Sequence, residues 1–149
     1  MIPPVKIDDL MVMWEKDAKV DPLDPGASMA DIPRLHAKYL RILTYHNLMV
    51  KKYNKEFNEL KKVKWEYYNG DLNNPEDLKK HGMEPQLKKI LRQDIQLYID
   101  ADKDLNTALA RKANNQEIVD ACTYILKELH SRTFQIKSII EWTKFTDGT

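Results

Sequence analysis

The longest helical pattern in the chain reads IPRLHAKYLRILTYHNLMVKKYNKEFNELKKVKWEYY, residues 32–68 of 149. Apolar residues recur in it at steps of three and four. The first heptad column holds Ile32, Tyr39, His46, Tyr53, Leu60 and Tyr67, the second Leu35, Ile42, Met49, Glu56 and Val63, and the third Leu43, Val50 and Phe57. A stripe sustained over five heptads predicts a long amphipathic helix that packs on other helices as in a coiled coil.

The ends of this helix are marked by ordinary start and stop signals. We expect Asp31 to be its N-cap, with Pro33 in the first turn, and Asn69-Gly70-Asp71 to end it. An unbroken helix of this length would measure about 55 Å, whereas a compact chain of this size is about 40 Å across. We therefore expect either a bend near residues 44–47 or an oligomer whose copies share long helices, and we favour the oligomer.

The remaining sequence predicts further helices and therefore an all-α fold. We expect a helix over residues 8–19, a short piece over 74–82, a helix that starts at Glu84-Pro85 and fails at Asn114-Asn115, and a last helix from Ile118. The length predicts one helical domain. It is divided into an acidic segment with a Pro/Gly loop (1–26), a long basic helix or helix pair (31–69), a connecting segment (70–84) and a C-terminal helical region for assembly (85–146).

Composition and motifs exclude several classes of protein. Cys122 is the only cysteine, so no disulfide can form within the chain, and its place on an apolar stripe predicts a core thiol. Catalytic residues, metal ligands and cofactor motifs are not recognisable, so we expect a non-enzymatic protein without metal or cofactor. No apolar run is long enough to cross a membrane, and the N-terminus has no secretory pattern, so we expect a soluble intracellular protein.

Charge is unevenly distributed along the chain. The whole chain carries a formal charge of only +1, whereas residues 32–64 hold nine cations against two acids and residues 1–31 hold three cations against seven acids. Cations gathered on one element are typical of a site for a polyanion. The acidic N-terminal segment is a candidate contact for the basic helix or for a basic protein partner.

The cations and aromatics are densest at KKVKWEYYNG, residues 61–70. Cations that pair with phosphates and aromatic rings that stack on bases are the combination used in single-strand binding. Trp65 lies off the apolar stripe and is the better stacking candidate, whereas Tyr67 lies on the stripe and is expected to pack. A solvated helix surface on a coiled-coil scaffolding oligomer is the alternative reading, and a regulator that reads double strands is a further one.

Several short motifs follow one another along the chain, namely Asp9-Leu10 with Lys16-Asp17, then Lys62 to Gly70, Ala101 to Asp104, and Ser131 to Lys137 with Ile139 close behind. Their order and spacing together make the chain resemble the UvsY family of phage recombination mediators. The resemblance implies a protein that binds single-stranded DNA, helps to displace the phage single-stranded-DNA-binding protein and loads a RecA-like phage recombinase. It also implies action in the cytoplasm of the infected bacterial host.

The resemblance further implies a set of site residues. A Lys-x-Arg pair of the family falls on Lys62 and Lys64, so that lysine stands where the family has arginine, and Trp65 stands where the family has an aliphatic residue. With the neighbouring cations, the predicted DNA-binding set is Lys51, Lys52, Lys55, Lys61, Lys62, Lys64 and Trp65. The family implies a ring or open-barrel homo-oligomer, a hexamer or heptamer. The predicted assembly residues are Ile125, Leu129, Ile136, Ile139, Ile140 and Trp142.

Overall fold

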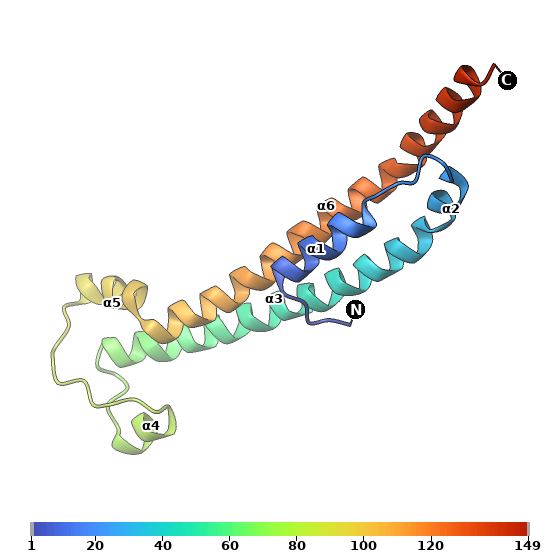
Figure 1. The fold of residues 1–149 in the computed structure, drawn as a ribbon. Helices are drawn as coiled ribbons and strands as arrows, with labels where there is room; N and C mark the ends of the chain where they lie inside the picture. Colours follow the sequence, from blue (N-terminus) through green and yellow to red (C-terminus); the bar gives the residue numbers. More distant parts are fainter. Residues whose placement is uncertain (1, 149) are drawn as a thin grey trace. The chain divides into compact units, whose positions relative to one another are not determined.

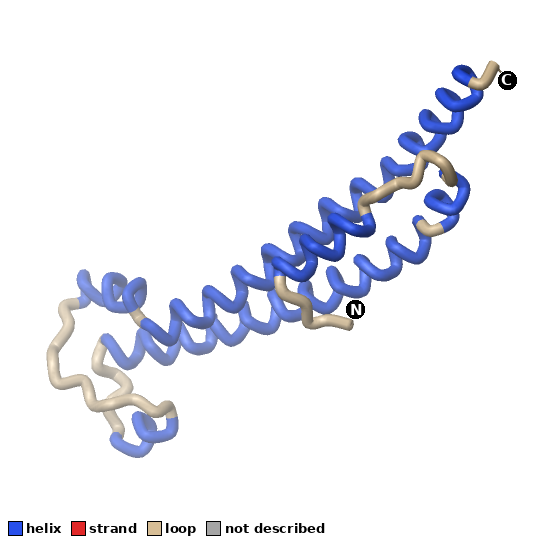
Figure 2. The backbone as a smooth tube through the Cα atoms, viewed as in Figure 1, coloured by secondary structure: helices blue, strands red, loops and turns tan. Residues whose placement is uncertain are grey.

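The protein is all-α, as predicted, in a computed structural model that describes residues 2–148 (Figures 1 and 2). The described residues contain no β-strand. The elements in order are α1 (Ile7–Asp17), α2 (Pro25–Ala30), α3 (Ile32–Tyr68), α4 (Pro75–Lys80), a 3₁₀ turn (Arg92–Asp94), α5 (Ile95–Ala101) and α6 (Lys103–Thr146). Two long helices, α3 and α6, therefore carry most of the chain.

The chain divides into two compact units. One consists of the described residues up to Met49 together with those from Asn114 onward, and the other consists of Val50–Ala113. Each of the two long helices supplies one part to each unit, because the boundaries fall within α3 and α6. The prediction of one domain stays a prediction, and the two units are described separately below.

The first unit is built on an apolar core shared by α1, α3 and α6. Leu10 of α1 is fully buried in an apolar cluster that includes residues of α3 and α6. The core residues are Val5, Leu10, Leu35, Tyr39, Ile42, Ile118, Cys122, Ile125 and Leu129. The apolar stripe of α3 is confirmed here, as is the prediction that Cys122 is a buried core thiol. Burial raises the pKa of this thiol to about 11, so it stays protonated at neutral pH.

Polar contacts hold the end of α1 in this unit. The guanidinium of Arg132 on α6 is buried and donates to the carbonyls of Asp17 and Ala18 at 3.1 and 2.9 Å, which lie at the C-terminus of α1. The Asp17 carboxylate accepts from Lys38 Nζ at 2.6 Å and from Tyr39 Oη at 2.8 Å. A cation at a helix C-terminus satisfies carbonyls that the helix leaves unpaired.

A buried histidine explains why α6 continues through Asn114-Asn115, where we predicted a break. His46 Nε2 accepts the Val5 N–H at 3.2 Å, and Nδ1 lies 2.7 Å from Asn115 Oδ1. Because Nε2 accepts, the ring is neutral with its proton on Nδ1, which donates to Asn115. The amide that suggested a helix end is thus used to satisfy a buried side chain on α3.

Three segments differ from the predicted helix boundaries. The helix predicted from Glu84-Pro85 to Asn114-Asn115 is interrupted at Asp102, whose extended backbone separates α5 from α6. The turn α2 begins at Pro25 inside the predicted loop, because Asp24 caps it by accepting the Ala27 N–H at 3.2 Å and proline suits a first turn. Residues 83–91 are irregular instead of helical. Leu87 and Leu91, which predicted a helix there, are both exposed, so no packing stabilises helical turns at this place.

The core of the first unit can be tested at Leu10. Replacing Leu10 by alanine removes a fully buried side chain and is expected to lower the free energy of unfolding by about 2–5 kcal/mol. Val12→Ala on the same helix is the matched control, because Val12 is exposed, and its effect is expected to stay within about 0.5 kcal/mol. Urea unfolding followed by circular dichroism measures both, and equal effects would contradict the packing of α1.

Candidate nucleic-acid interface

Most of the predicted DNA-binding residues share one side of α3 within the second unit. At 100° per residue, Lys51, Lys55 and Lys62 lie within about 40° of one another around the helix axis, and Trp65 lies about 40° beyond Lys51. Lys52 and Lys61 flank this group on either side. We call these six residues the α3 face. Trp65 is 39% exposed, so its indole is open to a partner.

The cations of the α3 face are largely without acidic partners. Lys51, Lys52, Lys61 and Lys62 form no ion pair with any residue that the structure describes, and Lys55 approaches Glu59 only at 3.9 Å. Lys51, Lys52, Lys55 and Lys62 are exposed, and Lys61 is half-buried. Ammonium groups that are neither buried nor neutralised within the chain are available to phosphates.

Lys64 departs from the prediction, because its side chain is buried. Only 7% of the residue is exposed. Its Nζ lies 2.8 Å from Asp104 Oδ2 and 3.2 Å from Asp102 Oδ2, which are the carboxylates at the start of α6. Tyr68 Oη donates to Asp102 as well. In this structure Lys64 is therefore an internal partner of two acids, and it does not lie on the exposed α3 face.

Asp102 is the centre of this network. Its other oxygen accepts the Leu105 N–H at 2.9 Å, so it also caps the first turn of α6. Burial by itself raises the pKa of Asp102, but the hydrogen bonds from Tyr68, Leu105 and Lys64 outweigh it and hold the pKa below its ordinary value of 3.8. The four residues from Ala101 to Asp104, which carried part of the family resemblance, thus join α5 to α6 and hold Lys64.

The pKa shifts define the pH range in which the network stabilises the protein. Because the folded pKa of Asp102 is lowered, its contribution to the free energy of unfolding is fully present above about pH 3.8. That contribution is lost as pH falls through the folded pKa. Burial lowers the pKa of Lys64, but its bonds to Asp104 and Asp102 raise it above 10.5. The contribution of Lys64 to the free energy of unfolding is fully present below pH 10.5 and is lost as pH rises through the folded pKa.

The burial of Lys64 had a signal in the sequence. Lys64 lies seven residues after Phe57, so it continues the third apolar column of Leu43, Val50 and Phe57. Phe57 packs on the apolar cluster of Ile95, Ile99 and Leu105 in the second unit. A lysine in a packing column predicts a buried partner of opposite charge, and the partners are the acids of the 101–104 motif.

The predicted assembly residues fall into two groups. Ile125 and Leu129 belong to the core of the first unit, and Ile136 is fully buried. These three are packed within this chain, so they offer no exposed surface to a second copy. Ile139 and Ile140 are half-buried, and Trp142 is 65% exposed. Phe134 and Phe145, which the prediction omitted, are exposed nearby on the same helix.

Residues 2–148 contain neither a cluster of metal ligands nor a membrane-spanning helix. Those residues contain no group of three or more histidine, cysteine, aspartate or glutamate side chains that could hold a metal ion. None of their helices is long and apolar enough to span a bilayer. The arrangement is thus that of an all-helical protein whose most distinctive surface is a cationic helix side ending in a tryptophan.

Comparison with known proteins places the chain in a family. The family described as "Recombination, repair and ssDNA binding protein UvsY" matches residues 13–149, so the chain belongs to the UvsY family. It is therefore a member of a phage recombination and repair family, and this family is one of DNA-binding proteins. No match was found among curated protein sequences.

Solved structures agree with this placement at the level of the fold. Two crystal structures of the bacteriophage T4 recombination mediator protein UvsY, in different lattice forms, are similar to this chain. One is 20% identical with a TM-score of 0.82 over 97% of this chain and 99% of that chain. The other is 19% identical with a TM-score of 0.78 over 95% and 99%. The chain thus follows the same helical fold over nearly all of its length.

Lys64 provides a test of the buried network. Lys64→Ala leaves the buried Asp102 carboxylate without its cation, and the expected loss in free energy of unfolding is about 3–5 kcal/mol. Hydrogen exchange should become faster in residues 95–109, which include Asp102 and the cluster of Ile95, Ile99 and Leu105.

Lys64→Arg is the matched control, because arginine keeps the charge, and slow exchange is expected to persist. Unchanged exchange in Lys64→Ala, combined with weaker binding of single-stranded DNA, would place Lys64 in the DNA interface instead.

Proposed function

We propose that this protein is a recombination mediator that binds single-stranded DNA through the α3 face. The observation that carries the proposal is the row of mostly exposed lysines, only one of which forms an ion pair within residues 2–148, that ends in Trp65 in a chain of a DNA-binding family. Lys51, Lys52, Lys55, Lys61 and Lys62 contact phosphates, and the indole of Trp65 stacks on a base. Base stacking of this kind contributes about 1–3 kcal/mol per base and tolerates any sequence.

The role of Lys64 in this proposal is indirect. Its ion pairs with Asp102 and Asp104 join the last turns of α3 to the start of α6 in the second unit. A fixed end of α3 keeps Lys61, Lys62 and Trp65 in one orientation, which reduces the conformational entropy lost on binding a strand. One ammonium group is enough for this role, because Lys64 Nζ lies within 3.2 Å of both carboxylates.

The mediator activity follows from differential binding to states of DNA. By holding a strand in a conformation that the coating protein disfavours, the protein helps to displace the phage single-stranded-DNA-binding protein. The freed strand then nucleates a filament of the RecA-like phage recombinase. The acidic residues of the N-terminal segment, including Asp8 and Asp9 in the first turn of α1, are proposed contacts for these proteins in the host cytoplasm.

Homo-oligomerisation would give tight overall binding of single-stranded DNA even if each α3 face binds the strand weakly. We propose that Ile139, Ile140 and Trp142, with Phe134 and Phe145, form the contact between copies in a ring or open barrel of six or seven subunits. Exposed large apolar side chains gathered on one helix are typical of an interaction surface. Several α3 faces acting on one strand raise the overall affinity through effective concentration.

The alternative is a helical scaffolding oligomer without a specific DNA function. It would use the same apolar contacts between copies, but its lysines would serve only solubility. The two functions differ in one measurable property, because a DNA interface loses affinity steeply as salt rises.

The α3 face can be tested at Lys62. Binding of a labelled oligo(dT) is measured by fluorescence anisotropy over a salt titration. Lys62→Ala is expected to weaken binding and to reduce the slope of log affinity against log salt by about 0.7, the value for one phosphate contact on a single strand. The stability of the fold should not change, because the Lys62 side chain is exposed and unpaired.

Lys6→Ala is the matched control, because Lys6 is also exposed and lies in the acidic N-terminal segment. Equal affinities for the wild type, Lys62→Ala and Lys6→Ala at every salt concentration would remove the α3 face from the proposal.

The assembly surface is tested by changing Ile139 to Asn and Trp142 to Ser together. Light scattering is expected to find a large oligomer for the wild type and a small, folded species for the double variant. Leu23→Ser, at an exposed apolar residue outside α6, is the control and should leave the oligomer intact. A monomeric wild type at micromolar concentration would rule out the ring.

A further inference from the structure

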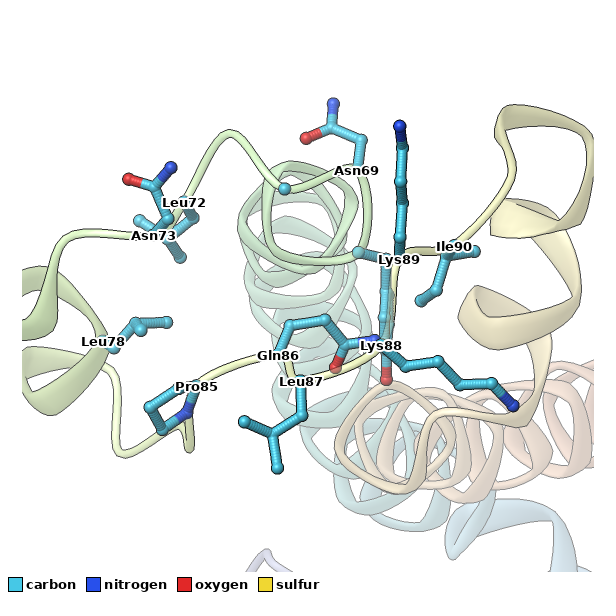
Figure 3. Close-up of a pocket in the computed structure, with 12 residues that line it drawn as sticks. Asn69, Leu72, Asn73, Leu78, Pro85, Gln86, Leu87, Lys88, Lys89 and Ile90 are labelled. Atoms are coloured by element: carbon cyan, nitrogen blue, oxygen red, sulfur yellow. The ribbon is translucent and has the colours of Figure 1, made fainter.

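A cavity of about 450 Å³ lies beside the C-terminal end of α3, beyond the α3 face and within the second unit (Figure 3). Its wall is formed by the end of α3, by α4 with the residues that precede it, and by the irregular segment 85–90. The lining side chains comprise an apolar group, three amides and two lysines. Its size lies in the range of about 300–1,000 Å³ that is usual for small-ligand sites.

The irregular segment is fastened to α3 by one hydrogen bond. Tyr67 Oη, in the last turn of α3, donates to the Glu84 carbonyl at 2.6 Å. This bond holds the segment carrying Lys88 and Lys89 next to the residues that follow Trp65. Tyr67 therefore has a polar role in addition to its place on the apolar stripe.

The electrostatics of the cavity favour an anion. Lys88 and Lys89 are exposed, and neither forms an ion pair within the described part of the chain. None of the residues that line the cavity is acidic, although Asp71 and Glu84 lie in the flanking sequence. The peptide N–H groups of residues 86–91 donate no hydrogen bond within residues 2–148. Lysine ammonium groups and free peptide N–H groups are both common phosphate contacts.

The other lining groups suit a nucleobase. Leu72, Leu78 and Pro85 lie together on one wall in Figure 3, and they offer an apolar surface for the face of a base. Asn69 and Lys89 point to the same side of the cavity (Figure 3). The oxygen of the Asn69 amide accepts the Asp71 N–H at 2.8 Å, which leaves its amide nitrogen free to donate.

We propose that this cavity is a second contact site for single-stranded DNA, which takes one nucleotide beyond those held by the α3 face. The base lies against Leu72, Leu78 and Pro85, where the Asn69 and Gln86 amides reach its polar edge. A phosphate is bound by Lys89 and the free peptide N–H groups, and Lys88 binds the next one. Amides can donate or accept, so the site takes any base.

The site rests on the proposed function, because it extends the path of the same strand. The segment is irregular although its residues could form a helix, and its Leu87 is 97% exposed. The irregular conformation keeps the peptide N–H groups of this segment unpaired. A helix would have used most of them internally.

The test compares two double charge reversals in the full-length protein. Lys88→Glu with Lys89→Glu removes the proposed phosphate contacts, whereas Lys6→Glu with Lys19→Glu changes the net charge equally at exposed residues of the first unit. By anisotropy with oligo(dT), the first variant is expected to bind roughly tenfold more weakly at low salt, with a salt slope smaller by about 1.4 for two phosphates. The affinity and salt slope of the second variant are expected to stay much closer to those of the wild type.

Photocrosslinking supplies an independent readout. An oligonucleotide containing 5-iododeoxyuridine is irradiated with wild-type protein, and mass spectrometry locates the crosslinked peptides. Crosslinks within residues 69–90 that are lost in the Lys88→Glu, Lys89→Glu variant are expected. Crosslinks confined to α3, or equal affinities of the two double variants, would overturn the cavity site while leaving the α3 face in place. A wild-type protein that does not bind the oligonucleotide at all would overturn both.

Discussion

The burial of one side of α3 is the constraint on which the rest of the structure depends. In the first unit that side presents Leu35, Tyr39 and Ile42 to α1 and α6, and in the second it presents Phe57, Leu60 and Lys64 to α5 and the start of α6. A helix that packs along one stripe must leave the opposite side in water. The lysines on that opposite side are exposed for this reason, and the proposed DNA interface follows from the packing.

The same constraint explains why neighbouring lysines have different roles. Lys62 and Lys64 are two residues apart, so they point to nearly opposite sides of the helix. Lys62 faces water, whereas Lys64 enters the packed side and is acceptable there only because Asp102 and Asp104 neutralise it. A sequence pair that looks like one binding motif thus combines a candidate strand contact with a structural ion pair. The segment that follows α3, fastened through Tyr67, adds a cavity of mixed apolar and cationic character to the same unit.

Much of the fold could be predicted from periodicity and end signals. The bounds of α3, the short helix α4 behind Asn74-Pro75 and the buried position of Cys122 follow from local rules of helix capping and amphipathicity. The errors arose where a distant residue decided the outcome. Asn115 does not end a helix because its side-chain oxygen accepts a hydrogen bond from His46. Residues 83–91 form no helix because nothing packs on Leu87.

For the candidate site, the composition of residues 32–70 was enough to indicate a polyanion surface, because the excess of cations and the off-stripe position of Trp65 are properties of the chain itself. Which cations remain available was decided by tertiary structure. Lys64 is buried in ion pairs with acids about forty residues further along the chain, so it is not available to DNA. The side chains of Ile125, Leu129 and Ile136 are buried within their own chain. Helical periodicity assigns a residue to a side of its helix, but only the packing of other elements decides whether that side is covered and whether a charge there is neutralised.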